Sequence, residues 1–120
     1  WHAYPSTVSV EDLVNTDSVD YDHVSDEMQY RGQFAADENG QYRFHTLKPG
    51  WYLNGGTFRP AHIHVKIWVG GVQRLTTQLY FVGDPLIETD PWAKQPLEVA
   101  LDEDTEGALS GTFDFVVDDA

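Results

Sequence analysis

One segment of the chain, residues 59–69, constrains the fold more than any other. It opens with Arg59, and His62 and His64 then alternate with aliphatic residues up to Val69. In a β-strand, residues two apart point to the same face, so the two imidazoles are expected to project together while the aliphatic side chains pack behind them. Two imidazoles on a rigid strand are half of a metal site. The pattern therefore predicts a strand over residues 61–69 with two candidate ligands on one face.

The rest of the chain is typical of short strands separated by glycine and proline. Gly70-Gly71 predicts a hairpin leading into a strand over residues 72–81, and Asn39-Gly40 predicts a second hairpin. Residues 83–96 contain three prolines and are expected to form an irregular loop. Shorter strands are expected at residues 30–35, 42–46, 99–101 and 111–117. The pattern predicts an all-β fold, a β-sandwich of mostly antiparallel strands with long loops around the candidate site.

Length and charge exclude several classes of function. At 120 residues the chain is expected to form a single domain over residues 1–120. Its net charge of −13 argues against nucleic acid and anionic membrane surfaces as partners, because both require basic patches. No apolar run is long enough to span a bilayer and no signal peptide is visible, so a cytoplasmic location is expected and a secreted form stays open. Without cysteine, any metal must be held by His, Tyr, Asp or Glu.

Two further residues near the histidines have chemistry suited to a metal site. Tyr52 follows the Pro49-Gly50 turn, and a tyrosinate is a hard anionic ligand that suits trivalent iron better than zinc or calcium. Arg59 would supply a fixed cation for an anionic substrate. The spacing leaves other interpretations open: the histidines would also fit a polar sheet face or a hydrogen-bonded core, and Tyr52 would fit ordinary packing in a sandwich.

The motifs of residues 30–85 resemble those of the intradiol ring-cleavage dioxygenases. RG, DENGQYRF, KPG with a following tyrosine, RPAHIH and TTQLYF occur together and in the family's order. The opening WHA and the closing GTFDFVV extend the resemblance over nearly the whole chain. It implies a β-sandwich that holds a non-haem Fe(III) ion by two tyrosines and two histidines. The implied reaction cleaves a catechol-type substrate between its two hydroxyls with O2 and gives a muconate-type diacid.

The resemblance also assigns the metal ligands. The RPAHIH motif gives His62 and His64 as the histidine ligands, and the KPG motif gives Tyr52 as one tyrosine ligand. For the other tyrosine, the stretch leading to Arg-Gly selects Tyr21, although an insertion must precede it and Val19 replaces the family's glycine. The alternatives for that ligand are Tyr4 and Tyr30.

Two polar residues match the family's substrate side. Arg59 corresponds to the active-site arginine and would stabilise charge developing on the ring, and Gln78 corresponds to a glutamine near the substrate that would orient it by hydrogen bonding. Family members carry further strands before the Trp motif, and the chain is expected to be a catalytic domain lacking them. The open sheet edge would then be covered by residues 6–20 or by another copy in a homo-oligomer.

Two other functions fit parts of the sequence. A cupin barrel also carries His-x-His, but its pattern requires a glutamate soon afterwards and a later histidine, and no histidine follows His64. A catalytically inactive sandwich that binds small aromatics or a partner protein would suit the four Trp and six Tyr. Trp68 is expected to pack, and the acidic stretch 102–106 is expected to be a solvated turn, with calcium binding as its alternative. Structural or solvated positions are expected for His2, His23 and His45.

Overall fold

The computed structural model describes residues 1–3, 30–54, 57–93 and 95–117, and this part of the chain is all-β. The strands are β1 (Tyr52–Asn54), β2 (Thr57–Arg59), β3 (His62–Val69), β4 (Val72–Phe81), β5 (Glu98–Val99), β6 (Asp102–Glu103) and β7 (Leu109–Ser110). Two short 3-10 helices, η2 (Ile87–Thr89) and η3 (Gln95–Leu97), interrupt the loop between β4 and β5. The predicted all-β class is confirmed. None of the described residues belongs to a helix long and apolar enough to cross a membrane.

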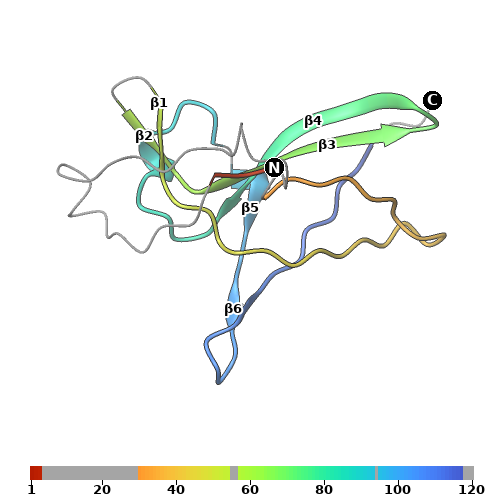
Figure 1. The fold of residues 1–120 in the computed structure, drawn as a ribbon. Helices are drawn as coiled ribbons and strands as arrows, with labels where there is room; N and C mark the ends of the chain where they lie inside the picture. Colours follow the sequence, from red (N-terminus) through yellow and green to blue (C-terminus); the bar gives the residue numbers. More distant parts are fainter. Residues whose placement is uncertain (4–29, 55–56, 94, 118–120) are drawn as a thin grey trace.

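The β3–β4 hairpin is the longest regular element (Figure 1). The two strands are antiparallel, with His62 opposite Tyr80 at the open end. Gly70 and Gly71 form the turn with φ values of 58° and 81°. A two-residue turn with both φ values positive matches the right-handed twist of the flanking strands, which explains why glycine is found at both positions. The predicted hairpin is confirmed, and β5 extends the sheet by pairing in parallel with the end of β4.

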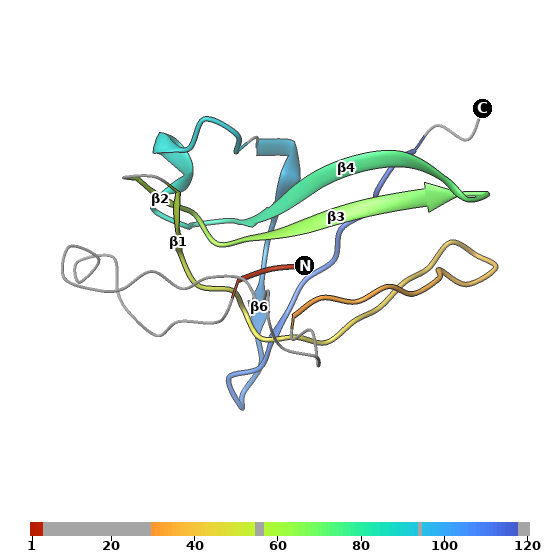
Figure 2. The ribbon, with the colours of Figure 1, turned by 45° about the horizontal axis from the view of Figure 1, so that its top comes forward.

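The apolar face of this hairpin forms the core. Its buried cluster consists of Ala61, Leu79, Phe81 and Val99. Residues 31–50 run beneath the hairpin as extended chain on both sides of the turn at residues 38–40, and residues 111–117 pass behind the hairpin (Figure 2). Phe113 and Phe115 pack against the core, and the Tyr42 hydroxyl donates to the Phe113 carbonyl at 2.6 Å. The strands predicted in these two segments are therefore extended but lack a regular ladder, and the two-sheet sandwich stays a prediction.

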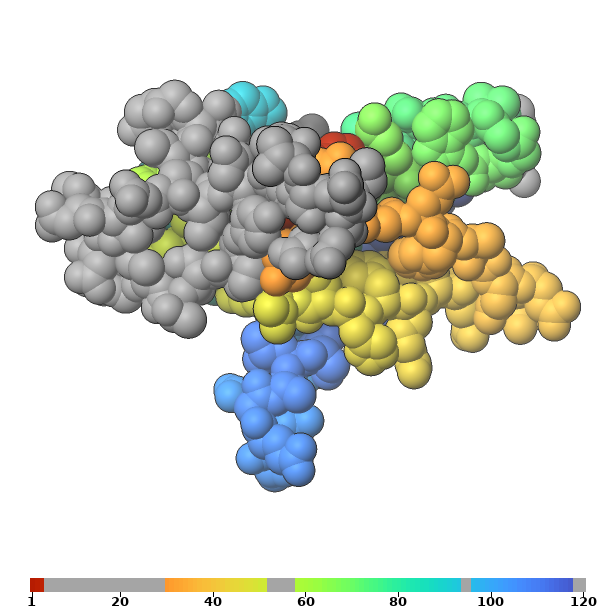
Figure 3. All heavy atoms as spheres, in the orientation of Figure 1, coloured from red at the N-terminus to blue at the C-terminus, as the bar shows by residue number. Residues whose placement is uncertain are grey.

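Two polar turns project from the body of the molecule (Figure 3). In the first, Asp37 accepts the backbone N–H groups of Asn39 and Gln41 through its carboxylate, and Gly40 has a φ of 76°. This is the predicted Asn-Gly turn. In the second, between β6 and β7, the Asp104 carboxylate accepts two backbone N–H groups in the same way. The acidic stretch is thus an exposed turn, as predicted.

The prediction of structural or solvated positions is confirmed for His2 and His45, and the prediction for Trp68 is wrong. His2 is structural: it is 4% exposed and its Nε2 lies 2.7 Å from the Thr46 hydroxyl. His45 is exposed, and His23 lies outside the described residues. The predicted packing of Trp68 is wrong, since its side chain is 56% exposed. It follows a β-bulge near the tip of the hairpin, beyond the face that the core covers.

A substitution at Gly111 tests how tightly the chain packs after β7. A Cβ at this position would lie 2.7 Å from a Val99 methyl and 3.0 Å from the backbone oxygen of Ala100. Because the backbone cannot move aside as a side chain can, we expect Gly111→Ala to lower the free energy of unfolding by about 1–3 kcal/mol. Urea unfolding measures this, and Gly32→Ala is the control because a Cβ there meets nothing within 4 Å. Equal stability of the two variants would contradict the described packing.

Candidate metal centre

His62 and His64 lie together on the polar face of β3, opposite the core. Their ring centroids are 4.9 Å apart with an interplanar angle of 75°. Across the strand pair they face Tyr80 and Gln78, because the register sets His62 against Tyr80 and His64 against Gln78. The expectation that the two imidazoles project together is confirmed. It follows from the period of two in an extended strand with one buried face.

The backbone sets the tautomer of His62. Its Nδ1 lies 2.8 Å from the Pro60 carbonyl oxygen, which can only accept, so Nδ1 carries the proton and Nε2 carries the lone pair. Burial lowers the pKa of His62 to about 4. Burial, followed by the charge of His62, lowers the pKa of His64 to about 3. Both rings are therefore neutral at pH 7, which is the form that ligates metal ions. The His64 ring also stacks on Trp1, with centroids 4.6 Å apart.

Two of the four candidate tyrosines lie in the part of the chain that the structure describes. For Tyr52 it gives the backbone, which begins β1 and pairs with Arg59 of β2, so this position lies at the entrance to the histidine strand. Tyr30 has a φ of 60°, and its ring stacks on His2 with centroids 4.9 Å apart. Tyr21 and Tyr4 lie outside the described residues. Within the described part, no three His, Asp or Glu side chains are placed to hold a metal ion together.

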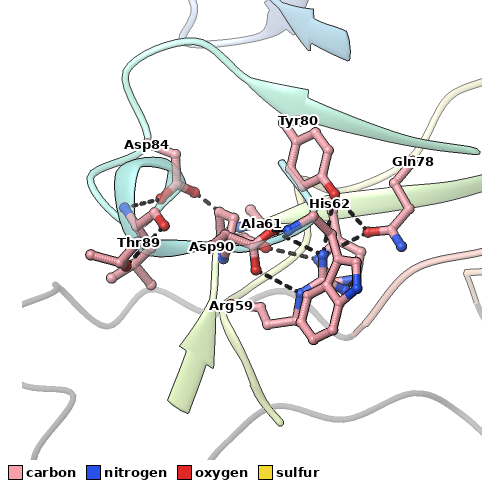
Figure 4. Close-up of polar contacts among 11 residues, drawn as sticks. Arg59, Ala61, His62, Gln78, Tyr80, Asp84, Thr89 and Asp90 are labelled. Atoms are coloured by element: carbon pink, nitrogen blue, oxygen red, sulfur yellow. Dashed lines mark hydrogen bonds and ion pairs between the residues drawn. The ribbon is translucent and has the colours of Figure 1, made fainter. Parts of the chain in front are cut away.

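Arg59 is held in place from several directions (Figure 4). Its Nε donates to Asp90 Oδ1 at 3.0 Å, and its Nη2 donates to Asp90 Oδ2 at 3.2 Å. Nη2 also donates to Gln78 Oε1 at 2.8 Å and to the Tyr80 hydroxyl at 3.2 Å. The Trp92 ring covers the guanidinium, with its centroid 4.7 Å from Cζ. The residue is 7% exposed, so an oriented cation lies beside the histidine pair.

Asp90 stabilises the charged form of Arg59. Burial alone would lower the pKa of the Arg59 guanidinium, but the hydrogen bond and the charge of Asp90 outweigh burial and raise that pKa above its usual value. The Nη1 of Arg59 lies 3.4 Å from Nε2 of His62. The cation therefore borders the His62 ring nitrogen that carries the lone pair.

A single carboxylate joins the two segments that carry candidate ligands. Asp84 Oδ2 accepts from the Trp51 indole N–H and from the Ala61 backbone N–H, each at 3.0 Å. Trp51 precedes Tyr52 in the chain, and Ala61 precedes His62. Asp84 Oδ1 accepts from the backbone N–H of Leu86 at 2.9 Å and so closes its own turn. The start of β1 and the start of β3 are thus fixed relative to the loop that follows β4.

A cavity of about 400 Å³ opens beside His64. Its size is within the range of small-molecule sites, and aromatic, aliphatic and hydroxyl groups line it. The lining residues are His64, Thr76, Thr77, Gln78, Tyr80, Pro91, Trp92 and Leu97. A second cavity of about 420 Å³ is lined by residues within 83–88 and by Glu98, and neither histidine lines it. The cavity beside His64 is therefore the one placed for chemistry at the histidine pair.

Sequence reasoning missed three members of this cluster. Tyr80 could have been found, because it lies two residues after Gln78 on the same strand face and within the same motif. Asp90 and Trp92 come from the irregular loop after β4, where no periodic pattern indicates the direction of a side chain.

Comparison with known proteins identifies the family. The family model described as "Dioxygenase" matches residues 14–119, which is most of the chain. The chain belongs to the intradiol dioxygenase family. It is 39% identical over 100 residues to the protocatechuate 3,4-dioxygenase beta chain of Burkholderia cepacia, covering 72% of this chain and 43% of that relative. It is 30% identical over 135 residues to a chlorocatechol 1,2-dioxygenase of Pseudomonas putida, covering 98% of this chain and 48% of that relative.

A solved structure supports the same family. The dioxygenase domain of a dioxygenase carbohydrate-binding protein fusion from Streptomyces sp. SirexAA-E superposes with a TM-score of 0.60 at 40% identity. The match covers 71% of this chain and 52% of that one. This intradiol dioxygenase chain therefore spans about half or less of the length of the curated relatives above.

A change at Tyr80 tests the hydrogen-bond network. Its hydroxyl accepts from Arg59 and donates to Gln78 Oε1 at 2.9 Å, and the residue is 1% exposed. We expect Tyr80→Phe to lower the free energy of unfolding by about 1 kcal/mol, because buried partners lose a hydrogen bond that water cannot replace. Urea unfolding measures this. Tyr42→Phe is the matched control, since its hydroxyl bond is exposed. A loss at Tyr80 no larger than at Tyr42 would argue against a closed network.

Proposed function

We propose that this chain is the catalytic domain of a non-haem Fe(III) intradiol dioxygenase. Its substrates would be a catechol-type molecule and O2, and its product a muconate-type diacid formed by cleavage between the two hydroxyls. The observation that carries the proposal is a pair of neutral imidazoles on a rigid strand, next to a buried and oriented arginine and a cavity of small-molecule size. Membership of the intradiol dioxygenase family supports it.

The donor set fits ferric iron. We propose His62 and His64 as nitrogen ligands and Tyr52 and Tyr21 as oxygen ligands. The lowered pKa values of both histidines support this assignment, because protons do not compete with a metal for these rings at neutral pH. When bound, ferric iron would acidify the catechol hydroxyls and draw electron density from the ring, so that the ring reacts with O2.

The side chains around the metal position would bind and orient the substrate. Arg59 would hold a permanent positive charge against the catecholate, and its planar guanidinium would donate in fixed directions. Gln78 accepts from Arg59 through its Oε1, so its amide nitrogen would be the group that donates to a substrate oxygen. Trp92 and Leu97 would supply an apolar wall for a flat ring. The bond from His62 to the Pro60 carbonyl would keep that ligand's ring from rotating.

Metal analysis and a substrate panel test the proposal directly. We expect protein produced with iron available to contain about one iron per chain and to be red-brown from tyrosinate charge transfer. We expect O2-dependent turnover of at least one compound among catechol, chlorocatechol, protocatechuate and hydroxyquinol. Stoichiometric zinc without iron, or an iron-loaded protein that turns over none of the four, would reject the proposed activity. Binding without turnover would indicate a non-catalytic aromatic-binding domain.

A tyrosine substitution tests the ligand set. Tyr52→Phe keeps an aromatic ring but removes the anionic oxygen, so we expect the visible band to shift or vanish and turnover to fall at least about 100-fold. Tyr42→Phe is the control, because its hydroxyl donates to the Phe113 carbonyl in an exposed bond and Tyr42 is not a candidate ligand. If Tyr52→Phe retains both colour and activity, the assignment of Tyr52 is wrong.

A further inference from the structure

We propose that Asp90 is a positioning residue, which sets the direction in which the Arg59 guanidinium donates in the active site. This inference rests on the proposed function, because it assigns the support of a residue that we place on the substrate side. It concerns a carboxylate that lies 31 residues from Arg59 in the chain.

The bonding pattern of the guanidinium is the first reason. Asp90 takes both Nε and Nη2, one with each carboxylate oxygen. A paired contact of this kind fixes the plane of the guanidinium as well as its position. Nη2 is further shared with Gln78 and Tyr80. Nη1 is then the nitrogen turned toward His62, at 3.4 Å from Nε2. If iron took the His62 lone pair, Nη1 would be the donor left for the substrate.

Burial is the second reason. The side chain of Asp90 is 1% exposed and that of Arg59 is 8% exposed, so water does not compete for the bonds between them. The face of the guanidinium lies against the Trp92 ring. The group is thus held along one edge by a carboxylate and on one face by an indole, and it cannot rotate about Cζ without breaking several contacts at once.

The origin of Asp90 in the chain is the third reason. It ends η2 and lies in the loop that also provides Trp92 and Leu97 to the cavity wall. The Asp90 carboxylate additionally accepts the Trp92 backbone N–H at 3.3 Å. The ion pair therefore docks this wall onto the end of β2, three residues before His62 in the chain. Orientation of the cation and closure of the cavity depend on the same carboxylate.

A purely structural ion pair is the competing explanation, and the two make different predictions. A structural pair would affect folding or iron content and leave each iron-loaded site with normal turnover. A positioning pair would lower kcat at each loaded site, and it would do so only while Arg59 is present. The comparison therefore requires turnover per iron, melting temperature and a double substitution.

The experiment uses Asp90→Asn, Arg59→Lys and the double variant of the full chain, each assayed with iron and with whichever catechol the wild type turns over. Asn matches Asp in shape but presents an amide N–H in place of one acceptor. Glu88→Gln is the matched control, because it removes a carboxylate from the same loop at an exposed position. A second readout is the Nε–H signal of Arg59 in the nitrogen-proton NMR spectrum of the metal-free chain, assigned by its loss in Arg59→Lys. This signal reports the orientation of the guanidinium without reference to activity.

We expect Asp90→Asn to lower kcat per iron by about 10-fold to 100-fold with a smaller change in KM, and to weaken or abolish the Arg59 Nε–H signal. The double variant should be no slower than Arg59→Lys alone, and Glu88→Gln should match the wild type. If Asp90→Asn does not fold, Asp90→Glu replaces it: this variant keeps the charge but displaces the guanidinium by one methylene, so we expect the same loss of kcat.

Three results would overturn the inference: normal kcat per iron in a variant that has lost only stability or iron, additive effects in the double variant, or an unchanged Arg59 Nε–H signal. A wild type that turns over no catechol would reject the proposed function instead. The Nε–H signal would then decide the positioning role by itself, since its loss in Asp90→Asn supports that role and its persistence rejects it.

Discussion

The antiparallel register between β3 and β4 is the constraint on which the site depends. It sets His62 against Tyr80 and His64 against Gln78, so four polar side chains share one face of a two-stranded ribbon. The opposite face is buried against the aromatic residues of the C-terminal segment. A shift of one residue would exchange the two faces, exposing the core and burying the imidazoles. The hydrophobic core therefore holds the candidate site residues in register from the opposite face of the hairpin.

The parts of the structure that sequence reasoning predicted are those fixed by local patterns. Alternation predicted β3 and β4, paired glycines predicted their turn, and the shared face of His62 and His64 followed from the same period. The pairing of Arg59 with Asp90 had no such signal, because the chain carries 20 acidic residues and nothing in their spacing singles out one of them. The segments around Tyr42 and Phe113 are extended but form no regular ladder. Strand propensity predicts an extended backbone, but it cannot specify which segment supplies the hydrogen-bond partners.

The distribution of charge within the fold contrasts with its overall composition. The chain has a net charge of −13, yet a buried cation stands next to the two histidines. Among the described residues, its oxygen partners are one carboxylate and two neutral groups, and an indole ring covers one face. Within the described network, one negative charge therefore compensates one positive charge. The proposed substrate, a dianionic catecholate, would then meet a local cation without a second carboxylate in the described network to repel it.

The hydrogen bond between His62 and the Pro60 carbonyl has an evolutionary consequence. Many histidines that are candidates for binding a metal depend on an acidic side chain to fix their tautomer, and such a partner can be lost by a single substitution. Here the acceptor is a main-chain oxygen, which every amino acid supplies. Substitutions near position 60 can alter this bond only by moving the backbone. Which ring nitrogen of His62 carries the proton is therefore conserved as long as the backbone conformation is conserved, whatever the neighbouring side chains are.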